Sequence, residues 1–125
     1  MRVFKNKWFS RFARQQGIAN SDLCDAVDRV ERGLIDADLG GGVIKQRIAR
    51  PGQGKSGGFR SIILFQSGGR AFFVYGFPKS TRSNTDADEE KGFKELAQHF
   101  FALTDEQLQT AVETEALTEV ICDPR

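Results

Sequence analysis

The sequence predicts an α+β domain: a small antiparallel sheet with two N-terminal helices packed on it, a C-terminal helix and a further helical extension. Apolar residues recur at helical spacing before residue 33 and after residue 86, whereas the chain between them alternates as strands do. A length of 125 residues fits one domain of ordinary size. We therefore expect the order β, α, α, β, β, β, α, α, with the helices on one face of the sheet. The predicted domain covers residues 1–103, and residues 104–125 form an acidic helical extension.

The first predicted elements are a short edge strand over residues 2–5 and two helices. The first helix places its apolar bulk on one side and is interrupted at Gly17. These apolar residues are Trp8, Phe9, Phe12 and Ala13. The second helix is capped by Asn20 or Ser21 and stops at Gly33. Its apolar stripe consists of Leu23, Ala26, Val27 and Val30.

Three adjacent antiparallel strands are predicted in the middle of the chain. The first of them alternates, so that Lys45 and Arg47 lie on one face of the sheet while two isoleucines lie on the other. The second and third are rich in aromatic and β-branched residues, and Pro78 ends the third. The three strands cover residues 43–49, 59–66 and 71–77, joined by a glycine-rich loop (50–58) and a turn (67–69).

Two more helices are predicted near the C-terminus. The first is capped by Asn84 or Thr85, and its opening turn holds four acidic residues that suit the positive end of a helix dipole. Its buried stripe consists of Phe93, Leu96, Ala97, Phe100 and Phe101. The second begins with a capping box over residues 104–107. In the tail after residue 115, we expect apolar residues to pack and the last three residues to fray.

The net charge of +1 conceals a strong separation of charge. Residues 1–82 hold 15 basic and 6 acidic side chains, whereas residues 83–125 hold 3 basic and 11 acidic ones. Residues 43–82 carry no carboxylate at all, which is typical of a protein that binds polyanions. Their cations are Lys45, Arg47, Arg50, Lys55, Arg60, Arg70, Lys79 and Arg82. On charge alone, a solvated basic face balanced by an acidic helix fits equally well.

Several classes of protein are excluded by what the sequence lacks. No stretch is long and apolar enough for a membrane span, and residues 1–5 do not open a secretory signal, so we expect a cytoplasmic protein with no membrane partner. Cys24 and Cys122 lie far apart without metal-site spacing, which predicts reduced thiols. We expect no cofactor and no metal, because the acidic residues that open the helix near residue 86 are explained by its dipole.

Two familiar kinds of site are also excluded. The segment GQGKS at residues 52–56 has the lysine and serine of a phosphate-binding P-loop, but Ala49 stands where the first glycine is required and a strand follows instead of a helix. His99 is alone and falls outside the apolar stripe of its helix, which predicts a surface residue and no histidine-based chemistry.

The remaining candidate is a cationic sheet that binds RNA. A ring for base stacking comes from Tyr75, and phosphate can be bound by cations of the strands and of the loops that join them. Lysines crowded by like charge can transfer protons, and arginines can stabilise charge that develops at phosphorus, so attack by a ribose 2′-OH needs no metal. Binding of a polyanion without any chemistry is the alternative.

Three ordered motifs resemble the RelE/HigB-like toxins of bacterial type II toxin-antitoxin systems. They are LGGGVIKQRI at residues 39–48, GQGKSGGFR at residues 52–60 and FVYGFPKS at residues 73–80, followed by Asn84 before the last helix. The resemblance covers about residues 1–103. It implies the same α+β fold that the element order predicts, and it implies endonucleolytic cleavage of messenger RNA, commonly in the ribosomal A site. It also implies a cognate antitoxin, typically a helix-turn-helix protein that binds DNA.

The resemblance implies a set of site residues by their place in the motifs. The catalytic residues would be Lys45, Lys55, Arg60 and Tyr75, and the RNA-binding residues Arg47, Arg50, Lys79 and Arg82. Some relatives use histidine or acidic residues near the last helix, whereas this chain offers only His99 there, which favours lysine and arginine catalysis. The fold also includes toxins that inhibit DNA gyrase, so a gyrase-directed toxin, a noncatalytic RNA-binding module and an inactive relic are the alternatives.

Overall fold

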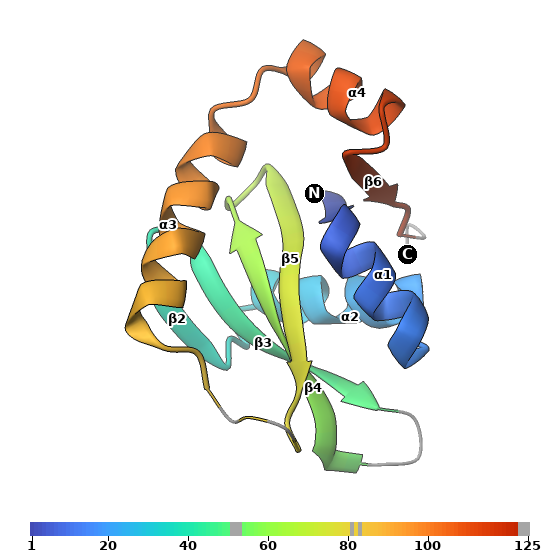
Figure 1. Ribbon diagram of the computed structural model, residues 1–125, viewed down its shortest axis with the longest axis vertical. Helices are drawn as coiled ribbons and strands as arrows, with labels where there is room; N and C mark the ends of the chain where they lie inside the picture. The colour runs from blue at the N-terminus through green and yellow to red at the C-terminus, as the bar shows by residue number, and fades with distance from the viewer. Residues whose placement is uncertain (51–53, 81, 83, 123–125) are drawn as a thin grey trace.

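The structure, a computed structural model, contains one six-stranded sheet and four helices in the part of the chain that it describes, residues 1–50, 54–80, 82 and 84–122 (Figure 1). The side chains of residues 50 and 54–57 also lie outside the description. The elements in chain order are β1 (Arg2–Asn6), α1 (Lys7–Gln16), α2 (Asn20–Glu31), β2 (Ala37–Gly40), β3 (Val43–Arg50), β4 (Gly54–Phe65), β5 (Arg70–Pro78), α3 (Ala87–Phe101), α4 (Asp105–Glu113) and β6 (Leu117–Val120).

The sheet has the strand order β2-β3-β4-β5-β1-β6. Strand β1 runs parallel to β5, and every other neighbouring pair is antiparallel. This arrangement confirms the predicted α+β class and the three central antiparallel strands. The prediction of an edge strand at residues 2–5 is wrong, because β6 returns from the far end of the chain and pairs with the outer side of β1.

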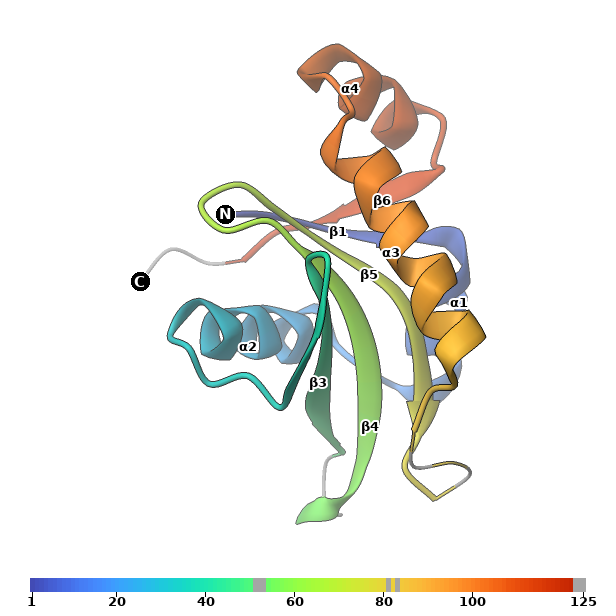
Figure 2. The same cartoon turned by 90° about the vertical axis from the view of Figure 1, so that its left-hand side faces the viewer.

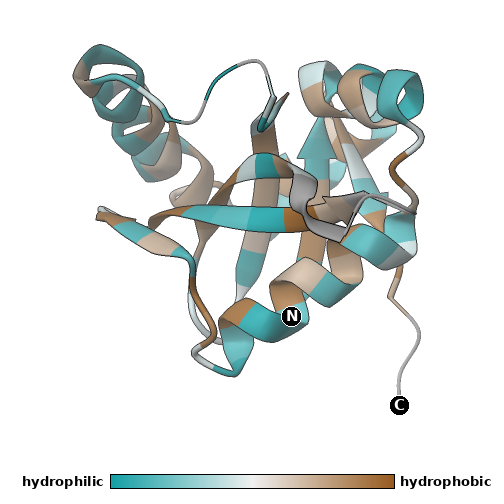
Figure 3. Ribbon diagram, turned by 90° about the horizontal axis from the view of Figure 1, so that it is seen from below, coloured by the Kyte–Doolittle hydropathy of each residue, from teal (hydrophilic) through white to brown (hydrophobic). Residues whose placement is uncertain are grey.

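Helices cover both faces of the sheet, so the prediction of helices on one face is wrong. Along β3, Val43 belongs to the core beneath α3 and α4, whereas Ile44 belongs to the core beneath α1 and α2. The same alternation separates Phe72 from Phe73 on β5. Figure 2 shows α2 and α3 on opposite sides of the sheet. Figure 3 shows hydrophobic and hydrophilic stretches within the strands. Strands β1, β3, β4 and β5 each supply residues to both cores.

The first two helices form largely as predicted. Helix α1 ends at Gly17, whose φ of 70° requires the left-handed conformation that glycine adopts readily. Phe9, Phe12 and Ala13 are buried, but Trp8 is 41% exposed. The predicted stripe of α2 is entirely buried. Neither Asn20 nor Ser21 is the N-cap of α2, because the helix already begins at Asn20 and the Asp22 carboxylate accepts from the Ala19 N–H at 2.9 Å.

The N-cap of helix α3 lies one or two residues later than predicted. Asp86 accepts from the Glu89 N–H and Glu89 accepts from the Asp86 N–H, so these two residues form the capping box instead of Asn84 or Thr85. The predicted box at Thr104 and Gln107 is confirmed at the start of α4. None of the helices in the described ranges combines the length and apolar character that crossing a bilayer requires.

Two short strands were not predicted. Strand β2 pairs with β3, although its four residues include Asp38 and Gly40, which disfavour strands. Strand β6 buries Leu117 and Val120, as expected for apolar residues of the tail, whereas Ile121 is exposed. Residues 123–125, expected to fray, lie outside the described residues. The division into a domain over 1–103 and an extension over 104–125 stays a prediction, although β6 extends the same sheet.

The two cysteines form a disulfide, and the prediction of reduced thiols is therefore wrong. Cys24 lies on α2, and Cys122 follows β6 by two residues. Pairing of β6 with β1 brings the C-terminal tail beside α2, although the cysteines are separated by 98 positions in the sequence. Sequence spacing alone did not reveal this proximity.

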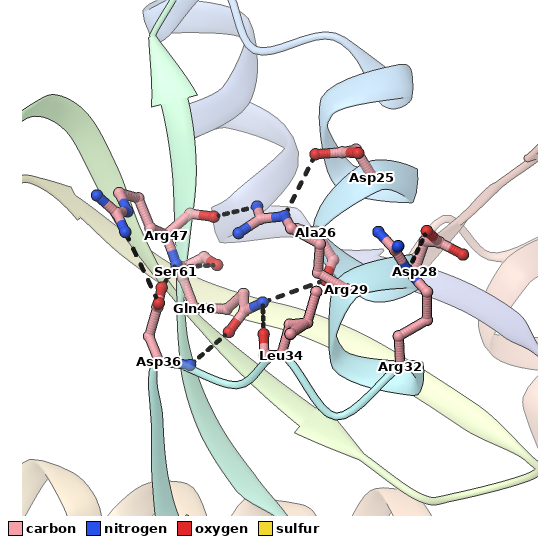
Figure 4. A network of polar contacts seen from close by, with 10 residues as sticks. All are labelled: Asp25, Ala26, Asp28, Arg29, Arg32, Leu34, Asp36, Gln46, Arg47 and Ser61. Atoms are coloured by element: carbon pink, nitrogen blue, oxygen red, sulfur yellow. Dashed lines mark hydrogen bonds and ion pairs between the residues drawn. The ribbon is translucent and has the colours of Figure 1, made fainter. Parts of the chain in front are cut away.

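A buried amide fixes the segment between α2 and β2 onto the sheet (Figure 4). Gln46 of β3 is fully buried, and its side chain donates to the Leu34 carbonyl at 2.9 Å and accepts from the Asp36 N–H at 3.0 Å. The backbone carbonyl of Gln46 accepts a hydrogen bond from the Ser61 hydroxyl at 2.8 Å, which links β3 to β4. These bonds satisfy polar groups that would be costly to bury without partners.

We predict that Gln46→Ala lowers the free energy of unfolding by about 2–4 kcal/mol, because it leaves a cavity and unpaired backbone groups. Urea denaturation followed by circular dichroism measures this change. Gln15→Ala on the exposed surface of α1 is the matched control, expected to change stability by less than about 0.5 kcal/mol. Equal effects of both substitutions would contradict the role given to the buried amide.

We predict that reduction of the disulfide between Cys24 and Cys122 lowers the free energy of unfolding by about 2–4 kcal/mol, because the bond closes a very long loop. Guanidinium denaturation with and without a dithiol reductant measures the difference. The double variant Cys24→Ser/Cys122→Ser is expected to match the reduced protein and to be insensitive to reductant. An identical midpoint for oxidised and reduced wild type would refute the prediction.

Candidate functional site

The registers of three strands bring the predicted cations of the sheet together. Arg47 of β3 lies directly opposite Arg60 of β4, which in turn lies opposite Phe77 of β5. One step along the same face, Lys45 lies opposite Ile62, and Ile62 lies opposite Tyr75. Directly opposed residues share a face of a sheet. We call the two rows, Lys45–Ile62–Tyr75 and Arg47–Arg60–Phe77, the cationic rows.

The cationic rows lie on the face that α3 covers, where the charged ends of the rows border the core to which Ile62 belongs. Val43 and Leu64 follow Lys45 and Ile62 along the same face, and both are buried in the core with α3. The Asn84 side chain, which precedes α3, accepts a hydrogen bond from the Lys45 ammonium group. The start of α3 therefore borders the cationic rows, and its later turns cover the adjacent core (Figure 1).

The opposition of Arg47 and Arg60 is electrostatically unfavourable, because like charges directly across two strands repel each other. The Asp36 carboxylate reduces this repulsion only in part: it accepts from the Arg47 backbone N–H and lies 3.9 Å from the Arg47 guanidinium. Arg60 has no hydrogen bond or ion pair from its side chain to any residue that the structure describes. Among the described residues, the Arg60 charge at the centre of the site therefore has no counter-charge.

Arg82 extends the positive surface from the loop after β5. Its guanidinium lies 5.1 Å above the Phe77 ring centroid and donates to both carboxylate oxygens of Glu89, at 3.1 and 2.5 Å. The hydrogen bond to Glu89 raises the pKa of Arg82 and lowers the pKa of Glu89. A further bond to the Asn84 carbonyl, at 2.8 Å, holds the same side chain. Arg82 is thus a charged group in a fixed position beside the rows.

Tyr75 lies in an aromatic cluster at the other side of the rows. Its ring centroid lies 4.6 Å from that of Trp8, 5.7 Å from that of Phe93 and 6.2 Å from that of Phe77. Helix α1 approaches β5 closely here, because a Cβ at Gly76 would lie only 2.8 Å from the Phe12 ring. Tyr75 and Trp8 both remain partly exposed, so their rings can meet a ligand.

The other predicted site residues are placed less fully. Lys79 follows β5 immediately and lies beside the first half of β4, because its backbone N–H donates to the Gly58 carbonyl at 3.2 Å. Lys55 lies on β4 and Arg50 at the end of β3, but the side chains of both fall outside the described residues. The structure therefore gathers Lys45, Arg47 and Arg60 with Tyr75 and Arg82, and the catalytic and RNA-binding roles of all eight residues stay predictions.

Two features near α3 take no part in the cationic rows. His99 is exposed and lies beside Phe100, which agrees with the prediction of a surface residue. Of the acidic residues at the start of α3, Asp86 and Glu89 form its capping box and Glu89 also pairs with Arg82, while Glu90 accepts from the Thr85 hydroxyl. Within the described ranges, no three His, Cys, Asp or Glu residues are arranged to hold a metal ion.

Sequence reasoning missed three contacts that shape the site. Glu89 was interpreted only as a dipole partner, yet it also holds Arg82. Asp36 was not connected to Arg47, because the return of the chain through β2 was not predicted. The aromatic character of Trp8 was noted, but its helical spacing indicated core packing and not contact with Tyr75. An exposed tryptophan next to a predicted stacking residue is visible only in three dimensions.

The arrangement is suited to binding a phosphodiester. Arginine guanidinium groups bind phosphate oxygens through paired hydrogen bonds, and Arg60 supplies such a group. Arg82 adds positive charge above Phe77, the residue opposite Arg60, although its terminal nitrogens are bonded to Glu89. An aromatic ring beside the phosphate position suits base stacking.

Comparison with known proteins identifies a family for this chain. The family model for the RelE toxin of the RelE/RelB toxin-antitoxin system matches residues 1–120. No curated protein matches the chain significantly. The match spans nearly the whole chain, including β6 and both halves of the sheet. The chain belongs to the RelE toxin family and is therefore the toxin of a toxin-antitoxin system, with an antitoxin as the partner that the family implies.

Proposed function

We propose that this toxin is an endonuclease that cleaves messenger RNA, in the A site of the ribosome, and so stops translation. The observation that carries the proposal is the half-buried Arg60, whose side chain has no counter-charge among the described residues, directly opposite Arg47 and beside a partly exposed tyrosine. A protein gains no stability from opposing two arginines, but a phosphate between them would convert the repulsion into attraction.

The reaction is attack of a ribose 2′-OH on the adjacent phosphorus. The bond from phosphorus to the 5′-oxygen breaks, which leaves a cyclic 2′,3′-phosphate on one fragment and a 5′-OH on the other. One proton leaves the 2′-OH and one is delivered to the 5′-oxygen, so the balance needs no added reactant. Lys45, Lys55 and Tyr75 are the proposed residues that can exchange protons, whereas a guanidinium stays charged and cannot.

The arginines of the site stabilise charge that develops on the phosphate oxygens. Arg60 faces the phosphate from the sheet, and Arg82 faces it from the loop, fixed there by Glu89. Such preorganised donors are most effective when they need no rearrangement during the reaction. Arg47, Arg50 and Lys79 are proposed to contact neighbouring phosphates, while Tyr75 stacks on a base next to the cleaved bond.

The partners follow from this reaction. Its substrate is messenger RNA on the ribosome, which places the toxin in the cytoplasm. The proposed antitoxin is a helix-turn-helix protein that binds DNA and keeps the toxin inactive. Inhibition of DNA gyrase is the alternative activity for a toxin of this fold. It predicts that cells expressing the toxin suffer DNA damage while their messenger RNA stays uncleaved.

We predict that Arg60→Ala lowers the rate of RNA cleavage by about 100- to 1000-fold while the protein stays folded, because it removes a donor to the developing charge. The measurement uses purified toxin, translating ribosomes and a labelled message. Arg32→Ala, which removes an exposed arginine of the α2 surface, is the matched control and is expected to retain wild-type activity. Wild-type cleavage by Arg60→Ala would overturn the proposed site, and failure of the wild type to cleave would overturn the proposed nuclease.

We predict that Tyr75→Ala weakens RNA binding by about 1–3 kcal/mol, whereas Tyr75→Phe binds RNA as the wild type does, because the phenyl ring preserves stacking. Fluorescence anisotropy with a short RNA that carries 2′-O-methyl groups, and so cannot be attacked, measures binding apart from cleavage. Equal weakening by both substitutions would contradict a stacking role for Tyr75.

A further inference from the structure

Surface arginines of this protein are mostly neutralised by carboxylates. Six ion pairs of this kind hold Arg2, Arg29, Arg32, Arg47, Arg70 and Arg82. Within the described part of the chain, the side chains of Arg60, Arg11 and Arg14 have no ion pair or hydrogen bond. Arg60 belongs to the cationic rows, but Arg11 and Arg14 lie on α1, outside them. The protein therefore leaves arginine charge uncompensated at two places.

The cations of α1 form a stripe on its exposed side. At about 100° per residue, Lys7, Arg11 and Arg14 fall within roughly 60° of the helix circumference, opposite the buried Phe9 and Ala13. All three cations are exposed. No carboxylate occurs in residues 1–21, so the sequence supplies no local counter-charge.

Stability of the helix does not account for this stripe. Like charges three or four residues apart repel each other, and Lys7 also lies at the positive end of the helix dipole, so only Arg14, in the last turn, is favoured by the dipole. The neighbouring helix α2 shows the usual solution, because Arg29 pairs with Asp25 and Arg32 pairs with Asp28, each four residues earlier. Helix α1 has the same kind of charge without the compensating carboxylates.

The stripe borders a shallow hollow with an unused polar group. The hollow has a volume of about 270 Å³ and is lined by Lys7, Ser10, Arg11, Arg14, Glu115 and Thr118. The Ser10 hydroxyl is buried and has no hydrogen-bond partner among the described residues. One carboxylate, that of Glu115, faces three cations here, so the hollow stays positive.

Lys5 adds to the positive charge near the stripe. Its ammonium group donates to the Asn20 side chain at 3.2 Å, and its pKa is lowered by burial and, to a smaller extent, by the charge of Arg14. The same helix reaches the cationic rows through the contact between Trp8 and Tyr75. An extended anion bound at the rows can therefore continue past Trp8 along α1.

We propose that Lys7, Arg11 and Arg14 form a second site for the sugar-phosphate backbone of RNA, which anchors the toxin outside the segment that it cleaves. That the ligand is RNA rests on the proposed function, whereas the positive charge of the stripe is observed independently of it. Successive cations are about 6 and 4.5 Å apart along the helix axis, which allows contacts to neighbouring phosphates of one strand. Such contacts carry affinity and no base specificity.

The test compares two double variants, each of which removes two positive charges. The α1 variant is Arg11→Gln/Arg14→Gln, and the control is Arg32→Gln/Lys91→Gln elsewhere on the surface. The probe is a labelled single-stranded RNA of about 30 nucleotides with 2′-O-methyl riboses, long enough to extend beyond the rows. We expect the α1 variant to bind about tenfold more weakly at about 0.1 M salt, with the slope of log K against log salt reduced by about 1.4. The control variant and a probe of about 5 nucleotides should show no such change.

A second arm measures cosedimentation of the same variants with ribosomes that carry no message. Weaker binding of the α1 variant only to the long probe identifies the flanking message as the bound backbone, and weaker binding to ribosomes identifies ribosomal RNA. Equal behaviour of the α1 and control variants in both arms would overturn the proposal. The same variants are also tested for cosedimentation with vesicles of anionic lipid. If the α1 variant binds these vesicles more weakly but binds RNA and ribosomes as the control does, the proposal is overturned in favour of a membrane surface. Because neither arm requires cleavage, failure of the nuclease hypothesis leaves this result interpretable.

Discussion

The opposition of Arg47 and Arg60 across β3 and β4 is the constraint around which the site is arranged. Two guanidinium groups at directly opposed positions repel each other, and the strands cannot move apart without breaking the sheet. The register is enforced from the other face, where Ile48 lies opposite Phe59 and both are buried against the first two helices. Burial of apolar side chains on one face thus holds together charges on the other.

The surrounding structure compensates this repulsion only in part. Asp36 is positioned by the Gln46 bonds and reaches Arg47, while Glu89 is positioned by the α3 capping box and reaches Arg82. Both carboxylates lie at the border of the cationic rows, and neither bonds to Arg60. The result is a surface with a fixed shape and an unbalanced charge, which is what recognition of a phosphate requires.

The sequence predicts those features that depend on local periodicity. The alternation of Lys45 and Arg47 with isoleucines follows from the pleat of a strand, and the buried stripe of α2 follows from the helical repeat. The predicted stripe of α3 does face the core, but only Ala97 of it is buried and its other residues are partly exposed. The register between Arg47 and Arg60 does not follow, because the sequence predicts strands over residues 43–49 and 59–66, whereas β3 extends to Arg50, β4 already begins at Gly54 and the pairing shifts between Ile48 and Arg50. Strand β6 and the disulfide depend on pairing with β1, more than 100 residues earlier, which no local pattern reveals.

The chemistry of RNA ends produced in cells tests the central claim most directly. Expression of the toxin without its antitoxin, followed by mapping of RNA 5′ ends, is expected to reveal new ends inside translated messages that carry a 5′-OH. Expression of Arg60→Ala is expected to yield none of these ends. Growth arrest by the wild type with intact messages would contradict the account, because the cationic rows would then act on another target.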